Sequence, residues 1–118
     1  MNERFRLAWA PAAIEDLDSI LDFLALREGV DAAIAWYRSL TERIDSLSIH
    51  TQRCRIVPEL ERFGIRSYRE LIAAPYRVFF RVEGGQVHIL AVLDARRDLE
   101  QLLIQRLLET EPNTDVSR

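Results

Sequence analysis

The residues best suited to recognition chemistry are arginines in the second half of the chain. All sixteen basic residues are Arg, and none is Lys. The planar, permanently charged guanidinium group binds carboxylates and phosphates through paired hydrogen bonds. Five arginines lie on or just after predicted strands and are the candidates for binding a macromolecular target: Arg69, Arg77, Arg81, Arg96 and Arg97.

RNA cleavage is a second use for the same arginines. Attack by a ribose 2′-hydroxyl needs a base, an acid for the leaving oxygen and cations around the phosphate. Glu70 and Asp94 are the candidate acid and base if the chain is a nuclease. The alternative for Arg77 and Arg81 is a solvated strand face, on which they pair with Glu70 or Glu83.

Metal and cofactor chemistry have no residues to carry them. Cys54 is the only cysteine, and the two histidines, His50 and His88, lack metal-ligand spacing. Because the chain has no lysine, it has no Schiff-base nucleophile. We therefore expect neither a metal ion nor an organic cofactor.

Charge is unevenly distributed along the chain. Residues 1–52 carry a net charge of −4, residues 53–106 carry +3, and the remaining residues carry −2. The total of −3 argues against a simple nucleic-acid binder. The basic excess is confined to the segment that holds the candidate arginines.

Length and composition predict a single domain. The 118 residues suffice for one compact domain, and a hydrophobic content of 48% supports a core. We expect this domain over residues 1–110 and a flexible polar tail over residues 111–118. No apolar run approaches the about 18 residues that cross a membrane, and residues 1–6 lack the apolar stretch of a signal peptide. We therefore expect a cytoplasmic protein that does not contact membranes.

Periodicity predicts a helical hairpin near the N-terminus. Apolar residues recur at spacings of three and four over residues 11–28 and again over residues 31–48. Pro11 suits the first turn of a helix, Gly29 suits the end of one, and Asp31 suits the N-cap of the next. The short connection makes the two helices antiparallel neighbours.

Alternation predicts the strands. A short strand over residues 4–9 comes first, and residues 66–72, 76–82 and 86–93 follow as three successive strands with Gly84-Gly85 as a hairpin turn. Residues 50–64 form a loop with a short strand at 53–57, and a last helix begins after Asp98. This order predicts an α+β fold, with a mainly antiparallel sheet, the two-helix hairpin on one face and a C-terminal helix.

Both faces of the last predicted strand are apolar. Alternation places Leu90 and Val92 with Phe79 on the face that the helical hairpin does not cover. The opposite side of the last strand then carries Val87, Ile89, Ala91 and Leu93. The uncovered face needs a second cover, for which the C-terminal helix and a partner chain remain alternatives.

The order of these motifs resembles the RelE/ParE family of toxins from type II toxin–antitoxin systems, and is closest to its ParE branch. Arg-Glu-Leu-Ile at 69–72, Tyr-Arg-Val-Phe-Phe at 76–80 and the strand that leads to Arg96-Arg97 are similar to the C-terminal half of the family. The segment from Trp9 to Leu17, with Ala33 and Tyr37, resembles the opening and helical hairpin of the ParE branch. The likeness spans roughly residues 5–108.

The resemblance implies a compact domain with a curved antiparallel sheet, and a cognate antitoxin that binds the toxin in a hetero-oligomer. Phe79, Leu90 and Val92 are then the candidate antitoxin contacts. In this family, RelE-like toxins cleave mRNA in the ribosomal A site, whereas ParE-like toxins inhibit DNA gyrase.

Two departures from the family pattern favour binding over catalysis. Asp94 stands where many members carry His, and the lysines and C-terminal tyrosine of RelE-type nucleases are missing, since the last tyrosine is Tyr76. We therefore expect a ParE-like growth inhibitor that binds a target such as gyrase and is not an enzyme. The alternatives are a ribosome-dependent mRNA endoribonuclease and an inactive relic that only binds its antitoxin.

Overall fold

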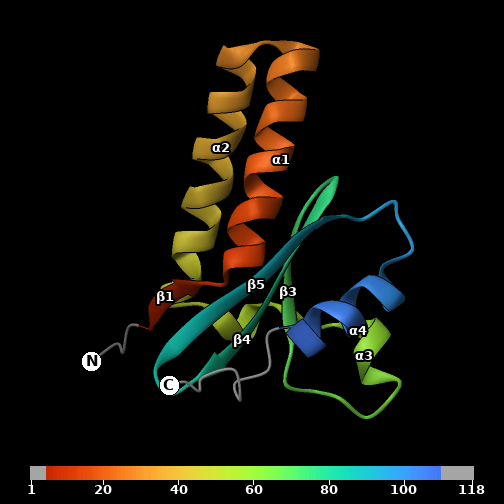
Figure 1. The fold of residues 1–118 in the computed structure, drawn as a ribbon. Helices are drawn as coiled ribbons and strands as arrows, with labels where there is room; N and C mark the ends of the chain where they lie inside the picture. Colours follow the sequence, from red (N-terminus) through yellow and green to blue (C-terminus); the bar gives the residue numbers. More distant parts are fainter. Residues whose placement is uncertain (1–4, 110–118) are drawn as a thin grey trace.

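The computed structural model describes residues 5–109, so the predicted tail over residues 111–118 lies outside the described part (Figure 1). Helices and strands do not alternate strictly along the chain, because α1 is followed by α2 and β3 by β4 and β5. In chain order the elements are β1 (Arg6–Trp9), α1 (Pro11–Glu28), α2 (Val30–Asp45), β2 (Arg55–Ile56), α3 (Pro58–Glu61), β3 (Arg69–Ala73), β4 (Tyr76–Glu83), β5 (Gln86–Asp94) and α4 (Leu99–Glu109). None of the helices among the described residues is long and apolar enough to span a membrane.

Helices α1 and α2 form the predicted hairpin. Pro11 occupies the first turn of α1, and Gly29 joins the two helices with a φ of 101°, a conformation that favours glycine. Helix α2 ends at Asp45, and the rest of the predicted helix is a 3-10 turn at Ser46–Ser48. The hairpin packs on the sheet near Ala13, Leu17 and Ile44 and then rises well beyond it (Figure 1).

Within residues 5–109 the sheet has five strands in the order β1-β5-β4-β3-β2. Only β1 and β5 are parallel, and the other neighbours are antiparallel, which confirms the predicted mainly antiparallel α+β fold. Gly84 and Gly85 both have positive φ, as a two-residue hairpin between β4 and β5 requires.

A β-bulge in β5 overturns part of the predicted side-chain pattern. Phe79 pairs with Ala91 and Phe80 pairs with Ile89, so Leu90 has no partner on β4. The extra residue reverses the alternation along β5. Val92 therefore packs with the hairpin-side core, whereas Ala91 packs with Phe79 on the opposite face. The prediction that Phe79 and Val92 share a face was wrong for this reason.

Helices α3 and α4 cover the second face of the sheet. Leu60 of α3 and Leu99 and Leu103 of α4 pack with Phe79 and Leu93 in a second buried cluster. The sequence predicted α4 but not α3, because four residues are too few to show a helical period. Helices α3 and α4 of this chain therefore cover the second face of the sheet, for which the sequence left two alternatives open.

Candidate functional site

The five candidate arginines do not form one cluster. Arg81 pairs with His88 near the β4–β5 turn, whereas Tyr76 pairs with Asp94 at the other end of the same strands. Tyr76 and Arg81 are five steps apart along the strand, a distance of about 17 Å. Arg96 and Arg97 follow Asp94 in the loop before α4. Arg81 therefore lies at the opposite end of the sheet from Arg96 and Arg97.

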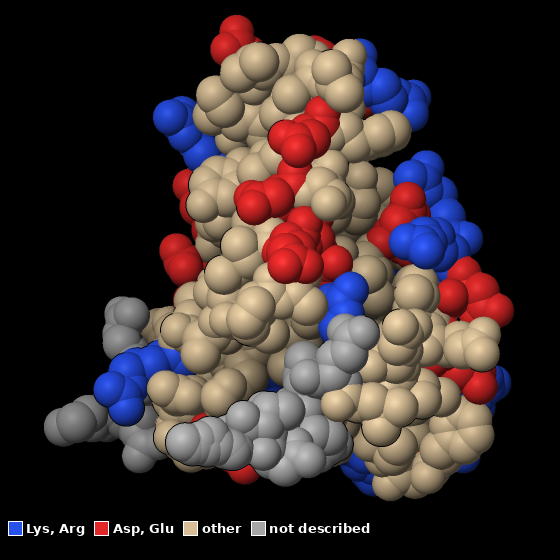
Figure 2. Space-filling view, viewed as in Figure 1, with Lys and Arg blue, Asp and Glu red and all other residues tan. Residues whose placement is uncertain are grey.

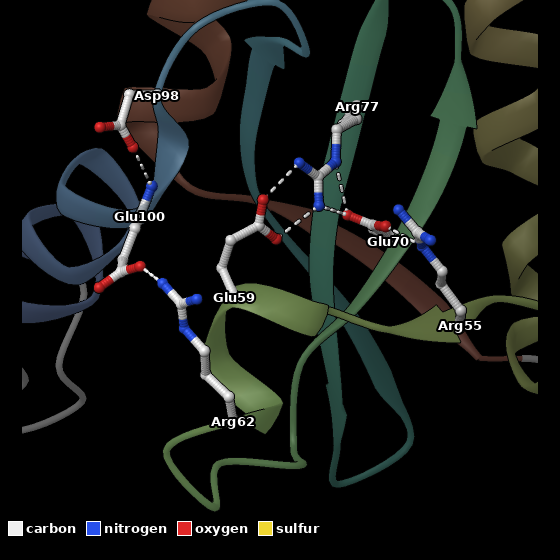
Figure 3. A network of polar contacts seen from close by, with 7 residues as sticks. All are labelled: Arg55, Glu59, Arg62, Glu70, Arg77, Asp98 and Glu100. Atoms are coloured by element: carbon white, nitrogen blue, oxygen red, sulfur yellow. Dashed lines mark hydrogen bonds and ion pairs between the residues drawn. The ribbon is translucent and has the colours of Figure 1, made fainter.

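Arg77 belongs to a buried ion-pair network (Figure 3). Its Nε donates to Glu70 Oε1 at 2.7 Å, and its two terminal nitrogens donate to the Glu59 carboxylate at 2.8 Å each. Arg55 donates to the other oxygen of Glu70. The Glu59 carboxylate raises the pKa of Arg77 further, and the hydrogen bonds from Arg77 lower the pKa of Glu59. The network thereby joins α3 to strands β2, β3 and β4.

Glu70 is poorly placed to act as a base. Only 1% of the residue is exposed, and both of its carboxylate oxygens accept hydrogen bonds from arginines. A general base must come within hydrogen-bond reach of the proton that it removes. Glu70 instead compensates the buried charge of Arg77. The neighbouring candidate, Arg69, uses a terminal nitrogen to donate a hydrogen bond to the backbone oxygen of Cys54 at 2.6 Å.

The loop from Asp94 to Asp98 presents the two remaining arginines. Arg96 grips the Asp94 carboxylate through its Nε and a terminal nitrogen, at 2.9 and 2.6 Å, and its backbone N–H donates to the same carboxylate at 2.9 Å. These hydrogen bonds lower the pKa of Asp94 to about 2, so it is a weak base at neutral pH. The side chain of Arg96 is still 71% exposed.

Arg97 is the second exposed cation of this loop. Among residues 5–109 its side chain has no hydrogen bond or ion pair, although its backbone N–H donates to the oxygen of Asp94. In the space-filling view, basic side chains gather over the loop between β5 and α4 (Figure 2). The loop therefore offers one guanidinium oriented by Asp94 and one with no partner in the described structure.

A cavity of about 400 Å³ lies beside this loop. It is lined by Asp16 and Phe23 of α1, by Tyr76 of β4 and by the loop residues Arg96 and Arg97. Phe23 is 49% exposed, whereas Tyr76 is buried and stacks edge-on against Trp36 with ring centroids 5.3 Å apart. Burial raises the pKa of the Tyr76 hydroxyl above its ordinary value. The cavity lining thus combines apolar side chains with two arginines and with the carboxylates of Asp16 and Asp94.

Asp16 and Arg106 close the edge of β5 next to this cavity. Strand β1 pairs with β5 only as far as Ile89, and beyond it Asp16 accepts a hydrogen bond from the N–H of Val92 at 3.0 Å. Arg106 of α4 grips Asp16 at 2.8 and 3.0 Å and donates to the oxygen of Leu90 at 3.3 Å. Sequence reasoning missed this pair, because 90 residues separate its members and no local pattern marks it.

The three candidate antitoxin contacts are buried. Phe79 and Val92 are each 2% exposed, and Leu90 is 5% exposed. Phe79 lies beneath α4, so a partner can reach it only if α4 moves away. The antitoxin contacts therefore remain a prediction, which for Phe79 requires that α4 moves away, whereas Val92 lies in the core on the hairpin side.

Comparison with known proteins places these features in a family. Residues 7–99 match the sequence profile described as "ParE toxin of type II toxin-antitoxin system, parDE". Among solved structures, the chain is similar to one titled "Chromosomal ParDE TA system from P. aeruginosa", with a TM-score of 0.65 and 24% identity. That alignment covers 77% of this chain and 96% of the other, and at this identity it supports the fold alone. No curated protein sequence matches the chain.

Proposed function

Since the chain belongs to the ParE toxin family of type II toxin–antitoxin systems, we propose that it inhibits growth by binding a macromolecular target, with DNA gyrase as the leading candidate. A cognate antitoxin would hold it inactive in a hetero-oligomer. The loop after β5 would supply the target contacts, because it is where exposed arginines lie beside a cavity.

One observation carries this proposal. Arg96 and Arg97 are exposed at the rim of the cavity, whereas Arg77 is buried and already paired with two carboxylates. Exposed guanidinium groups bind carboxylates or phosphates of a partner without first breaking a buried network. The recognition chemistry is therefore best supported at the β5–α4 loop.

The acid and base candidates give little support to RNA cleavage. Glu70 is enclosed by arginines, and Asp94 is held ionised by Arg96. The enclosed position of Glu70 and the lowered pKa of Asp94 do not suit proton transfer to or from a bound ribose at neutral pH. Binding without catalysis accounts for the observed arrangement more simply.

The test is to induce the chain in growing cells and to follow DNA replication and ribosome-bound mRNA together. We expect replication to stop first and mRNA to stay intact. Codon-specific cleavage of mRNA before any block of replication would replace the gyrase proposal with the nuclease alternative.

The arginine loop is tested by comparing Arg96→Ala/Arg97→Ala with Arg81→Ala. The loop variant should bind the target at least about a hundredfold more weakly, because two arginines are lost and each lost charged hydrogen bond costs about 1.5–3 kcal/mol. Thermal melts should match the wild type, since loss of an exposed Arg changes stability by about 0.5 kcal/mol or less. Full toxicity of the loop variant would refute the site, and loss of toxicity in Arg81→Ala alone would move it to the other end of the sheet.

A further inference from the structure

Arginines gather along the edge of the sheet where β2 pairs with β3. Because these strands are antiparallel, the residues before Arg55, including Arg53, approach the part of β3 that follows Glu70. Arg43 of α2 reaches the same part of β3 and donates a hydrogen bond to the backbone oxygen of Ile72. The edge arginines are Arg43, Arg53, Arg55 and Arg69.

Two of the edge arginines act on the side chain of Cys54. Arg69 donates a hydrogen bond to the backbone oxygen of Cys54 at 2.6 Å. Burial raises the pKa of the Cys54 thiol, and the positive charges of Arg69 and Arg43 oppose this rise. The guanidinium groups of a helix residue and a strand residue therefore lie close to one thiol at this edge.

Most of the positive charge at this edge has no carboxylate partner within the chain. Arg43 and Arg53 are exposed, and among residues 5–109 neither of them nor Arg69 forms an ion pair. Arg55 does pair with Glu70, but Glu70 is shared with a buried arginine of β4 (Figure 3). The side chain of Arg55 is still 58% exposed. The edge therefore presents positive charge to an external partner.

The acidic residues gather on another part of the molecule. Five of them lie on α1, at positions 15, 16, 18, 22 and 28, and a column of acidic side chains runs over that helix in Figure 2. Helix α1 packs against β5, which is three strand spacings, or about 14 Å, from β2. Exposed charges are largely screened beyond about 10 Å at 0.1 M salt. The net charge of −3 therefore does not prevent this edge from attracting an anion.

The surroundings of the edge arginines indicate the class of partner. Protein partners gain most of their affinity from aromatic and apolar anchors in pockets, whereas nucleic acids bind mainly through phosphate contacts with Arg or Lys. Beside the exposed Ile72, the exposed side chains of residues 50–55 are all polar: His50, Gln52, Arg53 and Arg55. We propose that the edge arginines bind the phosphate backbone of a nucleic acid.

This surface is separate from the β5–α4 loop. Strands β4 and β3 lie between β5 and β2 in the sheet. A nucleic acid at the β2 edge therefore leaves Arg96 and Arg97 accessible, and the proposal does not depend on the target assigned to the loop.

The test measures binding of the full chain to three labelled probes by fluorescence anisotropy: a DNA duplex, a single-stranded RNA and a peptide of glutamates. For the duplex, the logarithm of the affinity should fall with the logarithm of salt concentration by about 0.9 per phosphate contact. Contacts from the three arginines without ion pairs then predict a loss of about fortyfold between about 50 and about 200 mM salt. Binding of either nucleic acid supports the proposal, and the tighter one identifies the backbone.

Arg43→Gln/Arg53→Gln removes two of these three contacts. It should bind the duplex more weakly at about 50 mM salt, and its affinity should then fall only about three- to fourfold by about 200 mM. Arg43→Lys/Arg53→Lys should keep most of the affinity, since Lys also binds phosphate as a point charge. Thermal melts check that both variants fold like the wild type.

The matched control is Arg6→Gln/Arg27→Gln, which removes two exposed arginines from β1, at the opposite edge of the sheet, and from the end of α1. It should bind the duplex within about twofold of the wild type. Equal weakening in this control would show nonspecific attraction and would overturn the proposal. So would failure of both nucleic acids to bind at about 50 mM salt. A glutamate peptide that binds as tightly as the duplex, through Arg43 and Arg53, would make the partner an acidic protein instead.

Discussion

Burial decides what each arginine does. The side chain of Arg77 is 8% exposed and contacts Glu59 and Glu70. Its guanidinium carbon also lies 5.0 Å from the centre of the Phe79 ring. The side chain of Arg96 is 71% exposed and has one carboxylate partner. A buried charge needs a complete set of partners, whereas an exposed one is stabilised by water. Arg77 therefore supports the fold, and Arg96 remains available for recognition.

The role of Glu70 gives the first prediction. Glu70→Gln should lower the free energy of unfolding by about 3–5 kcal/mol, because it leaves the guanidinium of Arg77 buried and only partly compensated. The control is Glu83→Gln, which removes the carboxylate partner of Arg81. The side chain of Glu83 is 64% exposed, so this variant should lower the free energy of unfolding by less than about 1 kcal/mol. Urea titration measures both. If Glu70→Gln unfolds like the wild type but abolishes activity, Glu70 has a direct functional role instead.

The sequence could name the charged residues but not their depth. One alternative from the sequence placed Arg77 and Arg81 on a solvated strand face, paired with Glu70 or Glu83. The structure contains pairs of Arg77 with Glu70 and of Arg81 with Glu83, but Arg77 is buried and not solvated. Glu59 could not be predicted as a partner, because α3 reaches Arg77 only through tertiary packing. The separation of Arg81 from Arg96 follows from the β4–β5 hairpin, because Arg81 lies close to the Gly84-Gly85 turn whereas Arg96 follows the other end of β5.

At the scale of elements, local periodicity predicted most of what the structure contains. The apolar stripe of α2 and the glycines of the β4–β5 turn are local signals, so the hairpin and the meander could be predicted. The bulge at Leu90 could not, because an extra residue in a strand leaves no mark on an already apolar sequence. It changes which side chains of β5 face α4.

Packing of α4 on this face gives the second prediction, which compares neighbouring residues. Leu103 is 3% exposed in the second cluster, whereas Ile104 is 40% exposed on the outside of the same helix. Leu103→Ala should lower the free energy of unfolding by about 2–5 kcal/mol, and Ile104→Ala should change it by about 0.5 kcal/mol or less. Chemical denaturation of the two variants checks this. Equal effects would mean that α4 does not rest on Phe79 and Leu93 in solution.

At the scale of the whole molecule, two layers of helices are held on one sheet by different means. The hairpin layer packs through a large apolar core, whereas the α3–α4 layer adds ion pairs at its margins, such as Arg62 with Glu100 (Figure 3). The family profile ends at residue 99, the first residue of α4. The profile match therefore covers the hairpin and the sheet but almost none of α4, which packs on the second face.

The pair of Asp16 and Arg106 connects these two layers across the open edge of β5, and it gives the last prediction. Both side chains are less than 20% exposed, at 15% and 17%, so solvent screens their attraction only partly. Asp16→Asn and Arg106→Gln should each lower the free energy of unfolding by about 1–3 kcal/mol. If the pair acts as a unit, the double variant should cost less than the sum by about 0.5–3 kcal/mol. Asp18→Asn on the same helix is the control and should change the free energy of unfolding by about 0.5 kcal/mol or less.

Hydrogen exchange at the amides of α4 should also become faster in both single variants. The reason is that loss of the contacts of Arg106 frees α4 from α1 and from the backbone of Leu90. Additive costs, with exchange in α4 unchanged, would show that the two layers are stabilised independently.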